Sequence, residues 1–390
     1  MALPRTTGSL LLALTLSDFL LFIIREQLDL DWLLFYFKHE VYTIMQLYND
    51  RGYVNIKEIL KHPATFIFIY GGRGTGKTYG TLQEMIDGKH KFIYMRRLDA
   101  QVQIVKKDDM QPFKTLNTDR GWNITPFPIN KYISSFYEAD VNADGKLIPQ
   151  GESYGLLTAL STFSNLRGVD GSDIECMILD EFIPELNERP IKGEADAIFN
   201  AYETINRNRE LKGMDPIKLV CLANSNRIDN PIFMELNLVR RAEQIRKAGD
   251  DFYYDKKRGM LLIDLYKSKI SEEKSETALY QLTKGTEFYN MAIKNAFLNE
   301  ERGRIETKPI KEYKPVVTIG EITIYKHKSR REYYVTEHRS GSPKTYGTGE
   351  KERERFRKDY MFLWKAYMKN MIIFEEFINE ILFDKYFRAK

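Results

Sequence analysis

Apolar positions along this chain follow two periods, and the change from one period to the other marks the elements. Short continuous apolar runs, typical of strands buried on both faces of a sheet, alternate with longer stretches in which apolar residues recur at helical spacing. This order predicts an α/β fold with a mostly parallel sheet between helices. The runs lie at residues 66–70, 91–95, 154–160, 176–179 and 219–223.

The same pattern divides the chain into four parts. Residues 1–28 are an apolar leader, and residues 29–242 carry the predicted sheet, with a helix over residues 29–48 packed beside it. Residues 243–305 are charged with helical spacing, which predicts a helical linker. Residues 306–390 predict a smaller α+β domain, because strand-like runs precede a long amphipathic helical region. Those runs lie at residues 316–319, 321–325 and 332–336.

The leader resembles a signal peptide, because Arg5 precedes an apolar stretch over residues 10–24. Asp18 interrupts that stretch, no A-x-A cleavage site follows it, and it is too short to span a bilayer. We therefore expect either a packed helix or an extension that is absent from the mature protein, and we expect no membrane partner.

Composition and charge exclude some classes of site. The chain has 59 basic and 55 acidic residues in 390, a balance too even to indicate a nucleic-acid partner by itself. Its two cysteines, Cys176 and Cys221, each lie in a strand-like run, so we expect both to be buried free thiols. Free thiols are typical of proteins in a reducing cytoplasm, where we expect this one. The five histidines are scattered without the spacing of a zinc site, so the metal we expect is Mg²⁺ bound with a phosphate.

Basic residues concentrate around the loops of the C-terminal part, a distribution that suits a phosphate backbone. These are Lys326, Lys328, Arg330, Arg331, Lys344, Lys351, Arg353, Arg355 and Arg357. Glu350, Glu352 and Glu354 are interspersed among those in the helical region, so an ordinary solvated surface explains them equally well. Contact with nucleic acid therefore stays open at this point.

An acidic run at residues 140–145 matches the first half of a calcium-binding loop. The twelfth position of such a loop needs a bidentate glutamate, and here it is Gly151. The Asp144-Gly145 pair between two strand-like runs predicts a hairpin turn instead.

A complete G-x-x-x-x-G-K-[ST] phosphate-binding loop directly follows the run at residues 66–70. Its glycines let backbone N–H groups surround an anion, and the helix that begins at the loop directs its positive dipole end to the same phosphates. Lys77 is expected to reach the β- and γ-phosphates, and Thr78 to ligate Mg²⁺. The helix should run to about residue 86, with Gly88 as its stop. The loop consists of Gly71, Gly72, Arg73, Gly74, Thr75, Gly76, Lys77 and Thr78.

A second motif supplies the other half of a hydrolytic site. The apolar run at residues 176–179 ends in Asp180-Glu181, the pattern of a Walker B strand. Asp180 is expected to hold Mg²⁺ through its water shell, and Glu181 to orient and deprotonate the attacking water. The pair favours hydrolysis of the nucleotide over binding alone.

Two polar features that follow fit a ring-shaped ATPase. Arg207 and Arg209 precede the run at residues 219–223, and Asn224 follows it. We expect Arg207 to project into the site of a neighbouring subunit and stabilise charge on the transferring γ-phosphate, with Arg209 as the second choice. Asn224 is expected to contact the γ-phosphate from the adjacent strand. Arginines at a helix end are also common as surface ion-pair partners, so the residues alone leave this role open.

Together these motifs resemble the genome-packaging ATPases of phi-29-like small tailed phages. The resemblance covers residues 59–239 well, the C-terminal part loosely and residues 1–25 not at all. It implies a P-loop ring-ATPase domain of the RecA/FtsK-like ASCE type, and it places Arg207 at the finger position. It also implies a homo-oligomeric ring, expected to be a pentamer, that acts in the host cytoplasm on the portal protein of the procapsid and pumps double-stranded DNA. The segments that carry it are residues 66–78, 92–97, 178–183, 206–210 and 221–224.

For the C-terminal part, the resemblance implies a reduced RNase-H-like nuclease fold that binds nucleic acid. Larger terminases cut DNA with a cluster of acidic residues that holds two metals. Here Glu321 and Glu337 lie near strand ends without an aspartate set. We therefore expect a vestigial nuclease domain that binds nucleic acid without cutting it, and a structural RNA stays open as a further partner.

The sequence thus favours a motor that uses ATP and Mg²⁺ to translocate double-stranded DNA into a procapsid. Two alternatives stay open. A DNA-pumping or helicase ATPase of the FtsK/HerA type shares every core motif, and portal binding without strand separation would argue against it. A nucleotide-gated scaffold would bind ATP without turnover, an interpretation that Glu181 disfavours.

Overall fold

The structure, a computed structural model, describes residues 45–166, 171–184, 188, 191–224, 228–286, 289, 304–341 and 343–388. The leader over residues 1–28 lies outside this part of the chain, as does the predicted helix over residues 29–48 up to residue 44. Among the described residues, no helix combines the length and the apolar character needed to cross a membrane.

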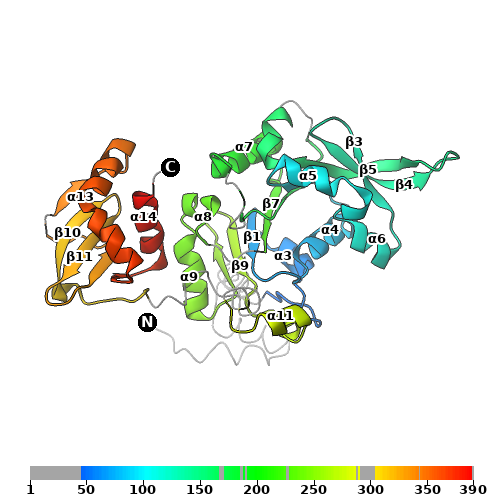
Figure 1. The fold of residues 1–390 in the computed structure, drawn as a ribbon. Helices are drawn as coiled ribbons and strands as arrows, with labels where there is room; N and C mark the ends of the chain where they lie inside the picture. The colour runs from blue at the N-terminus through cyan, green and yellow to red at the C-terminus, as the bar shows by residue number, and fades with distance from the viewer. Residues whose placement is uncertain are drawn as a thin grey trace, which may run out of the picture.

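A nine-stranded sheet forms the larger part of the molecule, in the order β3-β4-β5-β2-β6-β7-β1-β9-β8 (Figure 1). The six neighbouring strands β5, β2, β6, β7, β1 and β9 run parallel to one another. The antiparallel strands β3 and β4 lie at one edge of the sheet and the antiparallel strand β8 at the other. The mostly parallel sheet predicted from the apolar runs is therefore confirmed. The strands are β1 (Phe66–Tyr70), β2 (Phe92–Arg96), β3 (Ile124–Pro128), β4 (Ser134–Val141), β5 (Leu147–Ala159), β6 (Cys176–Asp180), β7 (Lys218–Ala223), β8 (Phe252–Asp255) and β9 (Met260–Asp264).

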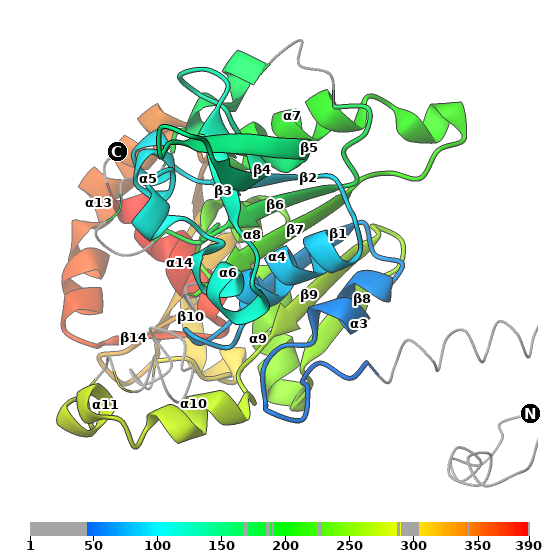
Figure 2. The ribbon, with the colours of Figure 1, turned by 90° about the vertical axis from the view of Figure 1, so that its right-hand side faces the viewer.

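Helices cover both faces of this sheet, because alternate residues of a buried strand point to opposite sides. In β1, Ile67 and Ile69 enter one core with α3, α4, α5 and α6, whereas Phe68 and Tyr70 enter another with α7, α8 and α9. Figure 2 shows α4 lying across one face of the central strands. The helices are α3 (Ile56–Lys61), α4 (Lys77–Asp87), α5 (Asp99–Val105), α6 (Lys114–Arg120), α7 (Glu194–Asn206), α8 (Pro231–Glu235) and α9 (Val239–Ala248), with 3-10 turns η2 (Asp108–Met110), η3 (Leu160–Leu166), η4 (Arg209–Lys212) and, later in the chain, η6 (Ile310–Glu312).

β4 and β5 form a long hairpin at one edge of the sheet that extends away from the rest of the molecule (Figure 1). In its turn the Asn142 N–H lies 2.9 Å from the Lys146 carbonyl oxygen, and Gly145 has a φ of 75°. Glycine adopts this left-handed conformation without the penalty that a Cβ atom imposes. The hairpin turn predicted at Asp144-Gly145 is therefore confirmed.

The predicted helical linker over residues 243–305 is helical over residues 243–248 but wrong over residues 252–264, which form two strands. α9 continues through Glu243, and β8 and β9 then join the large sheet, where β9 pairs with β1 in parallel. The turn between these two strands carries the charged residues 256–258, while β9 itself is fully buried. The large domain therefore extends past residue 242, and two short helices follow, α10 (Lys269–Lys274) and α11 (Ala278–Leu282).

A second sheet of five strands organises the C-terminal part, in the order β13-β10-β11-β12-β14. The three predicted strands form its antiparallel centre, and a parallel strand lies at each edge. The single long helical region predicted after them is wrong, because the apolar run of β14 pairs with β12 and separates α13 from α14. An RNase-H-like fold is not confirmed by this arrangement and stays a prediction. The elements are β10 (Tyr313–Ile319), β11 (Ile322–His327), β12 (Tyr333–Thr336), β13 (Lys344–Tyr346), α13 (Glu350–Met368), β14 (Ile372–Phe374) and α14 (Phe377–Phe387).

The two sheets are joined through α9 and α14. Arg240 on α9 forms ion pairs of 2.6 Å with both Glu337 and Glu376. The Phe377 N–H at the start of α14 donates to the Glu243 carboxylate at 3.1 Å, and the Phe377 ring enters the core of the large sheet. Burial raises the pKa of Glu243 to about 7. The C-terminal domain is therefore held against the large domain by charged and apolar contacts.

Candidate nucleotide-binding site

The phosphate-binding loop connects β1 to α4 at the carboxyl edge of the large sheet. It begins at Gly71, with a φ of 140°, and reaches α4 through Gly76, with a φ of 86°. A Cβ atom on Gly71 would lie 3.1 Å from the backbone nitrogen of Leu265. A larger residue at this position would therefore displace the backbone segment at Leu265. α4 begins at Lys77 with its first N–H groups toward the loop, an arrangement that binds phosphate.

Lys77 is buried inside this loop. Its Nζ atom donates to the carbonyl oxygens of Gly71 and Gly72, at 3.2 and 2.8 Å, and to the Thr75 hydroxyl at 3.1 Å. Burial lowers the pKa of Lys77 to about 7. A bound polyanion would favour the charged amine, because opposite charge raises the pKa of a lysine. The position therefore suits a ligand that brings negative charge.

Asp180, at the end of β6, lies against the loop through Thr78. The Thr78 hydroxyl is 3.1 Å from both carboxylate oxygens of Asp180, and the Tyr94 hydroxyl donates to one of them at 2.6 Å. Among the described residues, no group of three or more His, Cys, Asp or Glu side chains is arranged to hold a metal on its own. Mg²⁺ needs only one or two protein carboxylates when it is bound with phosphates and water. Thr78 and Asp180 fit such an ion, since their oxygen atoms already lie together.

Glu181 follows Asp180 in a left-handed conformation, with a φ of 57°. This backbone costs a non-glycine residue about 1 kcal/mol, and such residues cluster at functional sites. The carboxylate forms an ion pair with Arg96, which also lies 3.3 Å from Asp180. Burial raises the pKa of Glu181, against the opposing effect of Arg96. In this structure Arg96 thus holds the carboxylate that would activate water.

Arg96 and Tyr94 are candidate site residues that sequence reasoning missed. Both lie in β2, next to β6, and Arg96 is the direct neighbour of Asp180 in the parallel ladder. The available signal was an arginine at the carboxyl end of a buried strand, where a positive charge needs an acidic partner. Which acidic residue it meets depends on the order of the strands in the sheet.

Asn224 lies between the two motifs. β7 separates β1 from β6 in the sheet, and Ala223 pairs with Tyr70, the residue before the loop. Asn224 therefore follows the carboxyl end of a strand that runs between the phosphate loop and Asp180. Its contact with a γ-phosphate stays a prediction.

Arg207 lies at the opposite edge of the sheet from this cluster. It ends α7 with a φ of 45°, and its guanidinium donates to the Thr204 carbonyl oxygen at 3.3 Å. The neighbouring Asn206 side chain accepts the N–H of Ile217, so this turn lies near the start of β7, whereas the phosphate loop lies where the parallel strands end. Six residues of β7 span about 20 Å. The structure therefore does not bring Arg207 to the Lys77 of its own chain.

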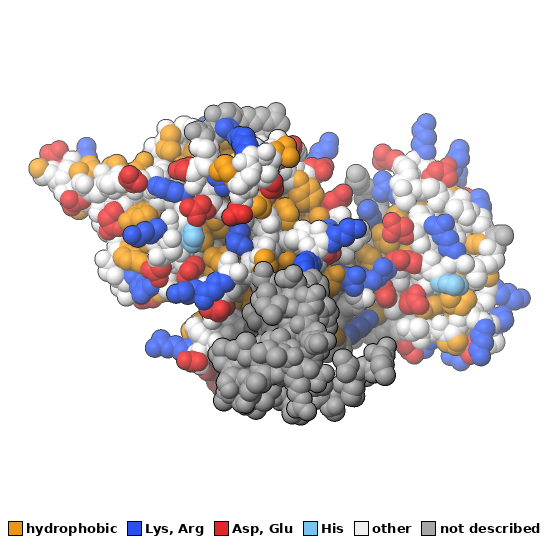
Figure 3. Space-filling model, turned by 180° about the vertical axis from the view of Figure 1, so that it is seen from behind, with side chains coloured by type: hydrophobic (Ala, Val, Ile, Leu, Met, Phe, Trp, Pro, Cys, Tyr) orange, Lys and Arg blue, Asp and Glu red, His pale blue; other side chains and the backbone are white. Residues whose placement is uncertain are grey.

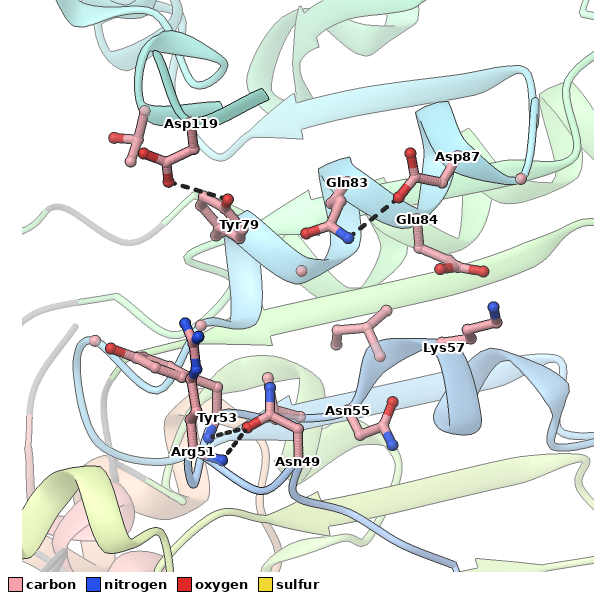
Figure 4. Close-up of a pocket in the computed structure, with 17 residues that line it drawn as sticks. Asn49, Arg51, Tyr53, Asn55, Lys57, Tyr79, Gln83, Glu84, Asp87 and Asp119 are labelled. Carbon is pink, nitrogen blue, oxygen red and sulfur yellow. Dashed lines mark hydrogen bonds between the residues drawn. The ribbon is translucent and has the colours of Figure 1, made fainter. Parts of the chain in front are cut away.

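Beside the loop, a pocket of about 1030 Å³ lies between α4 and residues 49–57 (Figure 4). The Val54 N–H donates to the Thr75 carbonyl oxygen at 2.9 Å, which ties that segment to the loop. The Tyr53 ring packs against Gly76, where a Cβ atom would lie 3.2 Å from it. Amide side chains line other parts of the pocket, among them Asn49, Asn55 and Gln83. A flat ring and hydrogen-bonding amides next to a phosphate loop are features that suit a nucleoside.

Solved structures of phage packaging motors share this fold. The bacteriophage Phi-29 viral genome packaging motor assembly matches with a TM-score of 0.57 at 19% identity, over 86% of this chain and 99% of that chain. The Phi-28 gp11 DNA packaging motor matches with a TM-score of 0.55 at 20% identity, over 87% of this chain and 99% of that chain. At this level of identity the likeness shows the fold alone.

Sequence comparison shows the family. The DNA packaging protein of Bacillus phage phi29 is 27% identical over 262 residues, 66% of this chain and 69% of that protein. The DNA packaging protein of Bacillus phage B103 is 28% identical over 256 residues, 64% of this chain and 70% of that protein. The model of the podovirus DNA encapsidation protein (Gp16) matches residues 124–348, more than half of the chain, which confirms the resemblance to phi-29-like packaging proteins. The phosphate loop lies before that range, so the nucleotide site rests on its own geometry. This chain belongs to the podovirus DNA encapsidation protein (Gp16) family.

Proposed function

We propose that this chain is an ATPase that moves double-stranded DNA into a phage procapsid. Its family is one of DNA encapsidation proteins. The observation that carries the enzymatic part is the meeting of Lys77, Thr78, Asp180 and Glu181 at one edge of the sheet. These four side chains supply phosphate binding, metal ligands and a base for water, which are the parts that phosphoryl transfer to water requires.

In the proposed reaction, the loop amides and Lys77 hold the phosphates of ATP, and Thr78 and Asp180 would hold Mg²⁺. When bound, the ion would supply positive charge against the phosphate oxygens. Glu181 leaves its ion pair, orients a water molecule and accepts its proton as the water oxygen bonds to the γ-phosphorus. The bond from that phosphorus to the bridging oxygen of ADP breaks, and Arg207 of a neighbouring subunit stabilises the charge that develops.

The pocket next to Tyr53 (Figure 4) is the proposed site for the adenine base. Tyr53→Ala removes a ring that would stack on the base, and stacking of this kind contributes about 1–3 kcal/mol. The variant is expected to bind ATP about ten- to hundredfold more weakly, measured by titration with a fluorescent ATP analogue. Tyr53→Phe keeps the ring and is the matched control. Equal affinity of Tyr53→Ala and the wild type would place the base elsewhere.

The C-terminal domain is proposed as a vestigial nuclease module that binds nucleic acid. Figure 3 shows Lys and Arg side chains spread over one face of this domain among acidic ones. Glu337, one of the two carboxylates considered for a nuclease metal, is paired with Arg240. DNA recovered from reactions with Mn²⁺ should therefore be uncut.

The proposed assembly is a homo-oligomeric ring, expected to be a pentamer, on the portal protein of a procapsid in the host cytoplasm. One support is that a matched structure is the Phi-29 packaging motor assembly. The other is the position of Arg207 at the sheet edge opposite the loop. In a ring of head-to-tail contacts, one surface of each subunit meets a different surface of the next, so this edge would face the site of a neighbour in the proposed ring.

Phosphate release by the purified full chain, with and without long double-stranded DNA, tests the proposed function. The wild type should release phosphate, and more rapidly with DNA. Lys77→Ala should release none, because the loop loses the amine that holds the phosphates. Absence of turnover in the wild type would favour the nucleotide-gated scaffold, and DNA stimulation accompanied by strand separation would favour an ATPase of the FtsK/HerA type.

A further inference from the structure

The chain that leaves the large sheet after β9 passes across the phosphate loop. The Leu265 N–H donates to the Tyr70 carbonyl oxygen at 2.9 Å, directly before the loop begins. The Ser268 hydroxyl donates at 3.0 Å to the carbonyl oxygen of Gly52, in the segment that borders the pocket. This stretch is therefore anchored to both parts of the nucleotide site, and α10 begins directly after it.

Lys274, the last residue of α10, reaches back to the loop itself. Its Nζ atom donates to the carbonyl oxygen of Arg73. A Cβ atom on Gly74 would overlap this amine and lie 2.9 Å from its Cε atom, so the lysine side chain lies directly against the loop. Arg73 and Lys274 are 201 positions apart in the sequence, so the phosphate-loop motif alone does not predict this contact.

Three cationic side chains therefore lie at this loop, namely the buried Lys77, Arg73, and Lys274, which donates to the Arg73 carbonyl oxygen. Burial lowers the pKa of Lys274, and the charge of Arg73 lowers it further. Like charges repel at short range, and a polyanion bound between them would offset that repulsion. A neutral carbonyl oxygen is also a weaker acceptor for an ammonium group than a phosphate oxygen.

We propose that Lys274 is a second phosphate-binding lysine of this site, which donates to β- or γ-phosphate oxygens of the nucleotide held by its own subunit. The proposal rests on nucleotide binding at the loop, the function proposed above. Lys77 is expected at the same phosphates, and its amine is close enough to Lys274 for their charges to interact. Lys274 belongs to the segment that follows the large sheet and precedes the C-terminal domain. When nucleotide binds, the Lys274 amine would leave the Arg73 carbonyl oxygen and donate to a phosphate oxygen. The position and stability of α10 would therefore depend on whether nucleotide is bound.

The test is the nucleotide affinity of the full chain in four forms, namely the wild type, Lys274→Gln, Lys274→Arg and Lys269→Gln. Lys269 is the matched control, because it lies on the same helix with an exposed side chain. Loss of a charged hydrogen bond to phosphate lowers affinity about ten- to hundredfold, and we expect that loss for Lys274→Gln with a non-hydrolysable ATP analogue. Lys274→Arg and Lys269→Gln should stay within about twofold of the wild type.

A second measurement separates a phosphate contact from a purely structural role. Amide hydrogen exchange in α10 should slow when the analogue binds the wild type or Lys269→Gln. In Lys274→Gln, saturated with the analogue at higher concentration, the exchange of α10 should not change.

Two results would overturn the proposal while the proposed function stands. The first is equal affinity of Lys274→Gln and the wild type. The second is an equal loss of affinity in Lys274→Gln and Lys269→Gln, which would assign the effect to the folding of α10. If the wild type itself bound no better than Lys77→Ala, both the proposal and the proposed function would be refuted.

Discussion

Glu181→Gln is expected to lower the rate of ATP hydrolysis by about 10²–10⁴-fold, the contribution typical of a general base, while ATP still binds. Glutamine keeps the shape of the side chain and a partner for Arg96, but it cannot accept a proton from water. Lys77 and Asp180 are unchanged, so the proposed ligands of the phosphates and of the metal remain. Single-turnover phosphate release with long DNA measures the rate, and titration with a fluorescent ATP analogue measures binding.

Glu175→Gln is the matched control, because Glu175 lies at the other end of β6 and its exposed carboxylate pairs with His90. Its rate should stay within about twofold of the wild type.

Burial raises the pKa of Glu181, and a base must be deprotonated to act. The wild-type rate should therefore fall as the pH decreases, and the midpoint of this fall should lie above about 4.3, the pKa of an exposed glutamate. A rate for Glu181→Gln close to that of the wild type would show that another group activates water.

Local patterns are sufficient to predict the parts of the site that lie within one strand and the loop after it. A phosphate loop and a Walker B strand require particular residues at fixed spacing, so residues 71–78 and the pair Asp180-Glu181 could be predicted together. The structure joins the two motifs through the hydrogen bonds of Thr78 to Asp180. The central strands could be predicted because burial on both faces requires continuous apolar runs.

Contacts between distant segments could not be predicted in this way. Arg96 meets Asp180 and Glu181 because β2 lies next to β6, and Lys274 meets the loop because β9 lies next to β1. The period of apolar residues indicates that a strand exists but does not give its neighbours. β8 and β9 were missed for a related reason, since the charged turn between two short strands resembles the polar face of a helix.

Arg207→Ala is expected to lower the ATP turnover of the assembled ring by about 10³–10⁵-fold, the effect of an arginine that stabilises a transferring phosphoryl group. Arg207 and Asn208 both have left-handed backbone conformations, with φ of 45° and 56°, so α7 ends in a tight turn that exposes the arginine. Steady-state phosphate release with DNA measures the turnover. Arg209→Ala is the comparison variant, because Arg209 is the second choice for the finger and lies two residues from Arg207.

Mixing two inactive variants decides whether the arginine acts between subunits. Lys77→Ala keeps Arg207, and Arg207→Ala keeps the phosphate loop, so a ring that contains both places some intact loops beside an intact arginine. About a quarter of the sites would be complete in a randomly mixed head-to-tail ring, and phosphate release should return. If Arg207 acted within its own chain, every subunit of the mixture would lack one essential group and no turnover would return. Full activity of Arg207→Ala alone would show that Arg207 does not stabilise charge on the γ-phosphate. Loss of activity in Arg209→Ala instead would assign that role to Arg209, since only a residue that reaches the γ-phosphate can stabilise the charge there.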